Sequence, residues 1–364
     1  MKKGKVLIVG GSGVIGNAAL EQFVSSEWET ISISRRLPEC LSGDFQHISL
    51  DLRDTKECKK IFSKINGITH IIYTALFEKP GLISGWYEKD QMETNLQMMK
   101  NVLEPICNSN RNLRHIIFLQ GTKAYGVHFH SIPTPSRENL RRDENDNFYW
   151  LQEDYVKNLQ KEYNWNWTIF RPQIVFGYSY GTAMNLIPVL GAYASICNET
   201  NEPFIFTGKP NAILEATDAK LIAKACEWAA LNKESENEIF NITNGDVFTW
   251  TDVWPSLADN LNIKYSKPSR DLFKLSEWLQ ERSNIWKKIV EKYNLKNISL
   301  SELLGESHHY IDFCFGYNSP DKIPPAIVST IKLRKAGFNE CVDTEEMLNN
   351  YLTELKERNI IPFF

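Results

Sequence analysis

Several patterns that would assign this sequence to a large class of proteins are missing from it. The chain of 364 residues has no apolar run of about 18 residues, so we expect no membrane-spanning helix. Its formal net charge is −4 and its Lys and Arg residues form no basic stripe, so it lacks the electrostatic footprint of a nucleic-acid-binding protein. We therefore predict neither a membrane nor a nucleic-acid partner.

Cysteine and histidine are too scattered to indicate a metal site. The seven cysteines include no CxxC pair, and the seven histidines include no HExxH motif, so we predict no bound metal. An odd number of scattered cysteines fits free thiols in a reducing compartment better than a disulfide framework. The apolar run that ends at Gly10 leads into a glycine-rich turn, which favours a first strand over a signal peptide. We expect a cytoplasmic location.

Up to residue 172, the sequence alternates short apolar runs with longer segments of helical periodicity. The runs predict strands at 5–9, 30–34, 47–50, 70–74, 115–119 and 168–170, and the segments predict helices over 14–25, 55–65, 91–109 and 149–163. Strands buried on both faces and separated by helices are typical of an α/β fold. We predict a Rossmann-type, doubly wound parallel sheet with helices on both faces. The segment 128–147, rich in Pro, Arg, Glu and Asn, predicts a long ordered loop, and loops of this length often contribute to function.

The pattern changes after residue 172. Two isolated strands are predicted at 204–207 and 239–242, an amphipathic helix over 218–232, and mostly helix from 250 to 364. We therefore expect a dinucleotide-binding domain over 1–178, to which the segment around 214–246 returns. A smaller, mainly helical portion over 179–364 would form the substrate pocket.

A glycine motif directly follows the first predicted strand and directly precedes a helix. Gly10, Gly13 and Gly16 have GxxGxxG spacing, in which the tight turn, the approach of a pyrophosphate and the strand–helix packing each need a residue without Cβ. The amides at the start of the helix, where Val14 and Ile15 follow, would then hold the phosphates. The context predicts a dinucleotide site.

The end of the second strand indicates which dinucleotide binds. NAD enzymes usually carry Asp or Glu near this point, whereas an arginine accommodates the 2′-phosphate of NADP. Here the sequence reads Ser34-Arg35-Arg36, and no acid occurs between Thr30 and Leu37. Guanidinium groups match phosphate as forked cationic donors, although two loop arginines exposed to solvent are the alternative. The sequence favours NADPH/NADP.

Further cofactor contacts are expected at the carboxyl ends of the predicted strands, where such folds bind their ligands. Asp51-Leu52 follows the third strand, and Asp51 is predicted either to contact the adenine or to cap a helix or turn. The other residues expected to line the cofactor site at these ends are Thr74, Ala75, Gln120, Gly121, Pro172, Ile174 and Val175.

A nicotinamide cofactor implies hydride transfer, and a carbonyl acceptor needs a group that stabilises negative charge on its oxygen. A tyrosine beside an ammonium suits this role, because the cation is expected to lower the pKa of the phenol. Short-chain dehydrogenases usually place both on one helix as YxxxK, but none of the 14 tyrosines is followed by Lys four residues later. The ordinary member of that superfamily is therefore excluded.

Two other segments carry the required residue types. Gly121-Thr122-Lys123-Ala124-Tyr125 follows the fifth strand, and Asn147-Phe148-Tyr149-Trp150-Leu151-Gln152-Glu153-Asp154 opens the next helix. Both resemble the progesterone 5β-reductase/iridoid synthase family, an atypical branch of the extended short-chain dehydrogenases. In that family a Lys in a GxKxY segment and a Tyr in an NFYYxxED segment replace YxxxK. The likeness continues through 171–179, 216–219, 240–248 and 335–338.

The resemblance implies an NADPH-dependent ene-reductase in which Tyr149, supported by Lys123, hydrogen-bonds the carbonyl of an enone or enal as it becomes enolate. The α-carbon would be protonated by solvent. By analogy, Trp86, Phe77 and Met184 are candidates for an apolar pocket, although the sequence itself favours ordinary packing for each of them. Tyr125 is either a second phenol near the substrate or a core aromatic residue. The family commonly has His where this chain has Ala124, which leaves the substrate open.

Two alternatives differ in kind from this hypothesis. One is an extended short-chain dehydrogenase acting on a sugar nucleotide, as an epimerase or dehydratase, but the missing YxxxK and the Arg35-Arg36 pair oppose it. The other is a non-catalytic NADP-sensing regulator, which the retained Lys123 and Tyr149 oppose. A homodimer is possible, and the sequence does not decide the oligomeric state.

Overall fold

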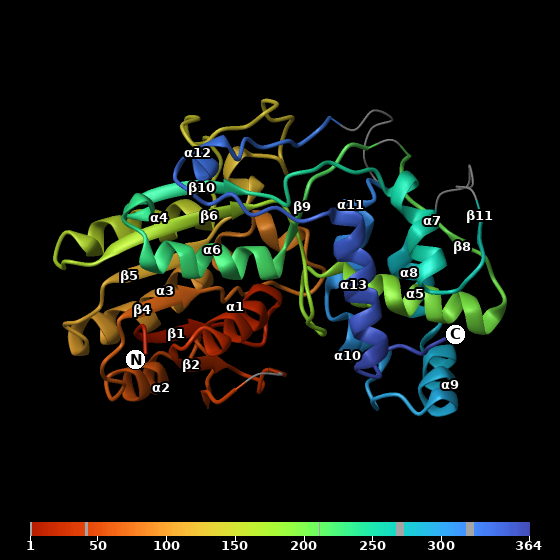
Figure 1. The fold of residues 1–364 in the computed structure, drawn as a ribbon, viewed down its shortest axis with the longest axis horizontal. Coiled ribbons are helices and arrows are strands. Elements are labelled where there is room, and N and C mark those ends of the chain that lie inside the picture. The colour runs from red at the N-terminus through yellow and green to blue at the C-terminus, as the bar shows by residue number, and fades with distance from the viewer. Residues whose placement is uncertain (1, 41–42, 211, 267–272, 318–323) are drawn as a thin grey trace.

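The computed structural model describes residues 2–40, 43–210, 212–266, 273–317 and 324–364. Within these ranges, one sheet of seven parallel strands runs in the order β10-β6-β5-β4-β1-β2-β3 (Figure 1). Its strands are β1 (Lys5–Val9), β2 (Glu29–Ser34), β3 (Gln46–Ser49), β4 (His70–Tyr73), β5 (His115–Leu119), β6 (Asn166–Pro172) and β10 (Glu238–Ile242). The predicted fold class, a parallel Rossmann-type sheet, is confirmed.

Helices cover both faces of this sheet because its strands are apolar on both sides. Along β1, Val6 and Ile8 pack in one hydrophobic cluster, while Leu7 and Val9 point the opposite way into a second cluster. The first cluster lies under α1 (Val14–Ser25) and α6 (Ala219–Leu231). The second lies under α2 (Thr55–Phe62), α3 (Lys89–Ser109) and α4 (Phe148–Gln160).

The C-terminal half is mainly helical and packs around a separate core that includes Tyr193, Trp254 and Trp286. In Figure 1 these helices stand beside the sheet, past the carboxyl ends of its strands. They are α5 (Leu186–Thr200), α7 (Trp250–Asn260), α8 (Leu275–Gln280), α9 (Ser283–Tyr293), α10 (Leu300–Leu304), α11 (Ser307–Cys314) and α13 (Thr344–Glu357). Among the described residues, none of the helices combines the length and apolar character needed to cross a membrane.

Short elements connect the two halves. Strand β7 pairs with β9 and β8 pairs with β11, while α12 packs beside the edge strand β10. Three 3₁₀ helices, η1, η2 and η3, add single turns. The bounds are β7 (Ile174–Phe176), β8 (Phe204–Ile205), β9 (Ala216–Asp218), β11 (Tyr265–Ser266), α12 (Ile331–Lys335), η1 (Ser84–Tyr87), η2 (Thr122–Tyr125) and η3 (Lys233–Ser235).

The structure differs from the predicted elements where apolar runs are short. The run at 204–207 forms only the two residues of β8, and β7 and β9 were not predicted. Helix α2 ends at Phe62 instead of 65, and the backbone N–H of its C-cap Ser63 donates to the carbonyls of Lys59 and Ile61. Residues 267–272 and 318–323 of the predicted helical range 250–364 lie outside the described residues.

Candidate active site

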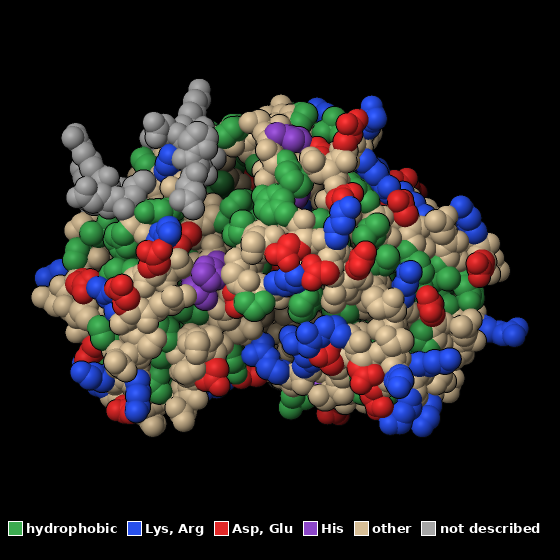
Figure 2. Space-filling view, turned by 180° about the vertical axis from the view of Figure 1, so that it is seen from behind, with side chains coloured by type: hydrophobic (Ala, Val, Ile, Leu, Met, Phe, Trp, Pro, Cys, Tyr) green, Lys and Arg blue, Asp and Glu red, His purple; other side chains and the backbone are tan. Residues whose placement is uncertain are grey.

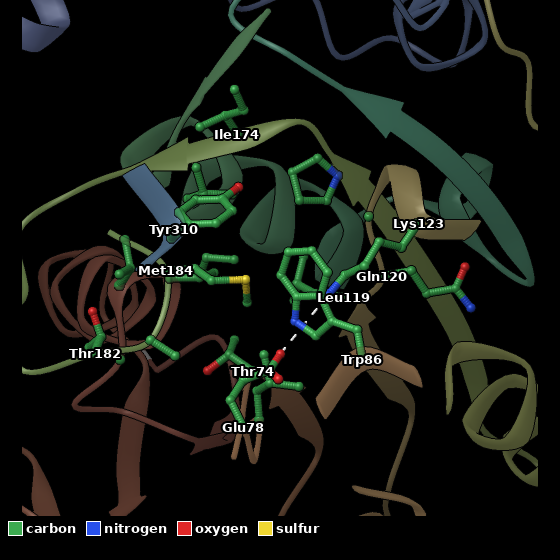
Figure 3. Close-up of a pocket in the computed structure, with 18 of the residues that line it drawn as sticks. Thr74, Glu78, Trp86, Leu119, Gln120, Lys123, Ile174, Thr182, Met184 and Tyr310 are labelled. Atoms are coloured by element: carbon green, nitrogen blue, oxygen red, sulfur yellow. Dashed lines mark ion pairs between the residues drawn. The ribbon is translucent and has the colours of Figure 1, made fainter. Parts of the chain in front are cut away.

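One cavity of about 1180 Å³ extends from the glycine turn after β1 to α11 in the helical half. Ligand pockets usually measure about 300–1,000 Å³, so this space has room for a cofactor and a substrate together. Hydrophobic side chains gather in the upper centre of the face in Figure 2, where the surface is hollowed. Figure 3 shows residues from both halves of the molecule pointing into the cavity.

The glycine turn is shaped to admit a pyrophosphate. Gly10 has a φ of +94°, and a Cβ there would lie 2.7 Å from the Ala75 nitrogen. A Cβ at Gly16 would lie 2.1 Å from the Gly10 carbonyl oxygen, so this glycine allows α1 to pack against the turn. Gly13 caps α1 without a side-chain hydrogen bond, which leaves the first amides of the helix open to an anion. These features fit a dinucleotide phosphate.

Cationic side chains surround the cavity end beyond β2 and β3. Arg35, Arg36 and Arg53 all line it, and Ser34 Oγ donates to the Arg36 carbonyl at 2.7 Å. The Arg36 guanidinium donates to the Tyr180 carbonyl at 3.0 Å, which orients it across the gap between the two halves. The sequence search missed Arg53, although its position two residues after Asp51 placed it at the same sheet edge.

Asp51 caps a turn. Its Oδ1 accepts from the Arg53 backbone amide at 3.0 Å, and its carboxylate also accepts from Nε and Nη2 of the Arg53 guanidinium, at 3.0 and 2.6 Å. This pairing lowers the pKa of Asp51 to about 2, and the charge of Arg35 acts in the same direction. The cap of α2 is Asp54, which accepts from the Glu57 amide. The adenine contact of Asp51 stays a prediction.

Asn147 connects the two segments that carry Lys123 and Tyr149. It is the N-cap of α4, where its side-chain oxygen accepts from the Tyr149 amide at 3.0 Å. Its side-chain nitrogen donates to the Lys123 carbonyl in η2, also at 3.0 Å. One amide group therefore positions the backbone of both predicted catalytic residues.

A buried polar network holds α4 against the sheet behind these residues. Gln120 at the end of β5 donates to Glu153 at 2.9 Å and accepts from Arg171 of β6 at 2.8 Å. Burial acts to raise the pKa of Glu153, but hydrogen bonds from Lys157, Arg142 and Gln120 outweigh it and hold this pKa below its ordinary value. Glu153 is therefore an ionised structural carboxylate.

The electrostatics of Tyr149 correct one expectation from the sequence. Burial raises the pKa of its phenol above the ordinary value, the Glu78 carboxylate adds to this rise, and only Arg171 opposes it. The expected lowering by Lys123 is therefore wrong, because the Lys123 ammonium lies 4.0 Å from Glu78 and 3.8 Å from the Trp86 ring centroid. Burial lowers the pKa of Lys123 itself to about 8, against the pull of Glu78.

Most of the residues predicted for the site line this one cavity. Tyr149 and Lys123 line it, as do Trp86, Phe77 and Met184. Gly16 and Tyr125 are outside the lining, and Tyr125 is a core aromatic whose hydroxyl donates to Asn241 at 2.6 Å. The other predicted residues in the lining are Gly10, Gly13, Val14, Ile15, Ser34, Arg35, Arg36, Asp51, Leu52, Thr74, Ala75, Gln120, Gly121, Pro172, Ile174 and Val175.

Several lining residues were not found from the sequence. Glu78 and His128 follow β4 and η2 in loops that carry no motif, and Tyr310 and Phe313 come from α11, far along the chain. Only the tertiary fold brings them to the site. The predicted long loop at 128–147 does contribute to the lining, through residues 128–132.

No group of three or more His, Cys, Asp or Glu side chains among the described residues is arranged to hold a metal ion. The free thiols include Cys58, Cys107, Cys197, Cys226, Cys314 and Cys341.

A parallel Rossmann sheet with a glycine turn at its carboxyl edge defines a dinucleotide-binding protein. The sequence model of the PRISE-like Rossmann-fold domain family matches residues 49–306, so the chain belongs to that family. The family predicted from the sequence is confirmed, and with it an oxidoreductase.

Curated relatives agree with this assignment. The 3-oxo-Δ(4,5)-steroid 5-β-reductase of Arabidopsis thaliana is 30% identical over 82% of this chain and 79% of its own length. The (S)-8-oxocitronellyl enol synthase of Camptotheca acuminata is 31% identical over 82% of this chain and 80% of its own length.

Solved structures at low identity show the fold. The UDP-glucose 4-epimerase of Thermotoga maritima has a TM-score of 0.66 at 16% identity and covers 97% of this chain and 99% of its own. The UDP-glucose 4-epimerase of Bifidobacterium longum, in complex with NAD+ and UDP, has a TM-score of 0.67 at 14% identity, covering 98% and 99%. At these identities the likeness extends to the architecture and not to the substrate.

Proposed function

We propose that the protein reduces the C=C bond of an enone or enal by 1,4-addition of hydride from NADPH. The convergence of the Tyr149 hydroxyl and the Lys123 ammonium on the cavity that begins at the glycine turn carries this proposal. Family membership supports it, because relatives of this chain are named as a steroid 5-β-reductase and as enol synthases. When bound, the cofactor supplies the hydride.

The roles of the two residues follow from their electrostatics. Tyr149 keeps its proton because burial raises the pKa of its phenol, so it donates a hydrogen bond to the substrate carbonyl and stabilises the forming enolate. Lys123, whose pKa is about 8, carries a positive charge at neutral pH and adds electrostatic stabilisation. The α-carbon then takes its proton from solvent.

NADPH is proposed over NADH because of the cationic end of the cavity. Arg35 and Arg36 follow β2, where an NAD enzyme would carry an acid. Losing one charge-assisted hydrogen bond to the 2′-phosphate costs about 1.5–3 kcal/mol, or roughly ten- to hundredfold in affinity. Arg35→Ala should therefore weaken NADPH binding by that factor and leave NADH binding almost unchanged, measured by titrating the fluorescence of each cofactor.

The reaction type is tested by following a labelled hydride. The protein is incubated with NADPH deuterated at the transferable position and an enal such as trans-2-hexenal, and the product is analysed by NMR and mass spectrometry. The proposal expects a saturated aldehyde with deuterium at the β-carbon. An allylic alcohol with deuterium at the carbonyl carbon would show ordinary carbonyl reduction instead.

No described feature favours either alternative function over this one. The epimerase likeness rests on folds below 25% identity and therefore shows architecture alone. A sensor without turnover would bind NADPH yet consume none with any enone or enal. The division of the chain at residue 178 and the possible homodimer stay predictions.

A further inference from the structure

A buried carboxylate in the cavity wall has one oxygen without a hydrogen bond. The side chain of Glu78 is 2% exposed, and its Oε1 has no hydrogen-bond partner. Its Oε2 accepts from the Gln91 amide at 2.5 Å, and that amide is held in place because the Lys79 N–H donates to its oxygen at 2.9 Å. Glu78 is thus fixed with one acceptor unused, which is a costly arrangement for a buried charge.

Two donors face this oxygen from other elements. The Lys123 ammonium lies 4.0 Å from Glu78 Oε1, which is too far for a direct hydrogen bond. The indole N–H of Trp86 is buried and acts as a donor toward the Glu78 carboxylate, but its geometry falls short of a well-formed hydrogen bond. In Figure 3 the three side chains converge on one part of the cavity wall, and the dashed line marks the Glu78–Lys123 pair.

The geometry of this gap selects one type of ligand group. An oxygen atom placed between two atoms 4.0 Å apart can lie at ordinary hydrogen-bond distance, about 2.8 Å, from both. It must donate to the carboxylate and accept from the ammonium. A hydroxyl does both, whereas a carbonyl cannot donate and an ammonium cannot accept.

We propose that Glu78, Lys123 and Trp86 form a hydroxyl-binding subsite, and that the preferred substrate of this chain is an enone or enal carrying a hydroxyl group. The inference rests on the proposed function and names a feature of its substrate. The hydroxyl donates to Glu78 Oε1 and accepts from Lys123 or Trp86.

A hydroxyl in this gap could come from the substrate or from a ribose of the cofactor. The surroundings favour the substrate. The Trp86 ring packs edge-on against Phe313 of α11, with ring centroids 5.3 Å apart, and so belongs to the wall shared with the helical half.

The test compares substrates that differ only in the hydroxyl. The values of kcat/KM are measured with NADPH for trans-2-hexenal, trans-2-octenal and trans-2-decenal and for their terminally hydroxylated forms. A hydrogen bond to a charged group predicts roughly ten- to hundredfold preference for at least one hydroxylated enal. Glu78→Gln should reduce this preference and Glu78→Met should abolish it. Trp86→Phe, which keeps the aromatic face beside Lys123, should reduce it.

Controls separate the possible sources of the effect. Glu93→Gln changes an exposed carboxylate on α3 and should keep the preference. The dissociation constant of NADPH should be the same in wild type and Glu78→Met. A weakened NADPH affinity with an unchanged preference would assign the hydroxyl to the cofactor and overturn the proposal.

Equal kcat/KM for all three pairs in the wild-type protein would also overturn the subsite, while leaving the reductase function intact. If NADPH is consumed with none of the enals, the proposed function itself fails.

Discussion

At the scale of the residue, Tyr149 offers a hydroxyl that the protein does not use for its own folding. Its amide donates to Asn147, whereas its hydroxyl makes no hydrogen bond with the described residues and faces the cavity beside Gly121. Tyr149→Phe should therefore leave the melting temperature and the NADPH affinity unchanged. Loss of one oxyanion donor should lower kcat by about 10²–10³. Steady-state kinetics with an enal, beside a cofactor titration, would measure both.

Full activity in Tyr149→Phe would remove Tyr149 from the reaction. A large loss of NADPH affinity would show that the Tyr149 hydroxyl contacts the cofactor.

Lys123 should set the alkaline limit of activity. Burial lowers the pKa of Lys123 to about 8, so its ammonium is lost as the pH rises through that value, and kcat should fall with it. Three facing groups do not titrate in this window, because the pKa of His128 is lowered to about 4, mainly by burial, and those of Tyr149 and Tyr310 are raised by burial. Burial also raises the pKa of Glu78, against the pull of the Lys123 ammonium. Measuring kcat as a function of pH would show this fall in activity as the alkaline limb of the profile.

Lys123→Arg serves as the matched variant, because a guanidinium stays charged throughout this range. Its alkaline limb should disappear even if its maximal rate is lower. A wild-type profile that stays flat up to pH about 10, near the ordinary pKa of lysine, would contradict a lowered pKa.

At the scale of the element, the start of α4 is fixed to η2 through a single side chain. Asn147→Ala removes an N-cap, which costs about 0.5–2 kcal/mol of stability, and also breaks the bond to the Lys123 carbonyl. We expect a lower melting temperature together with a lower kcat. Thermal unfolding and steady-state kinetics measure the two effects.

The control is Asp343→Ala, which removes the N-cap of α13, away from the cavity lining. It should cost similar stability and leave kcat unchanged. If both variants lose kcat equally, the effect of Asn147 is only on stability.

The same elements show what the sequence could predict. Strands β1, β4 and β5 carry continuous apolar runs, and the glycine turn follows directly on β1. These strands and the turn could therefore be predicted from the sequence. The two- and three-residue strands β7, β8 and β9 have too few residues to show a period.

The residues of the site fall into two groups, those that the sequence predicted and those that only the fold reveals. Lys123 and Tyr149 lie in local motifs and were found from the sequence. Glu78, Tyr310 and Phe313 are brought to the cavity only by packing of loops and α11, and the direction in which the Lys123 ammonium points depends on Glu78 and Trp86. That contact explains why the expected effect on the pKa of Tyr149 was wrong.

At the scale of the whole molecule, the two halves enclose their ligands together. The helical half supplies Met184, Tyr310 and Phe313 to the cavity, while the sheet supplies the glycine turn and the arginines. Each half has a hydrophobic core of its own: two clusters lie on the faces of the sheet, and a separate one lies in the helical half. The ligand cavity therefore lies between two halves whose cores are distinct.

The continuity of that space has a thermodynamic consequence. The glycine turn and Phe313 line the same cavity, so a cofactor and a substrate bound at once would share one space. We expect their affinities to be coupled, and such coupling is reciprocal. A saturated product aldehyde should bind weakly to the protein alone and more tightly with NADP+, and NADP+ should bind more tightly with the aldehyde by the same factor. Calorimetric titrations in both orders would measure the affinity of each ligand with and without the other. Identical affinities would mean that the cavity behaves as two separate sites.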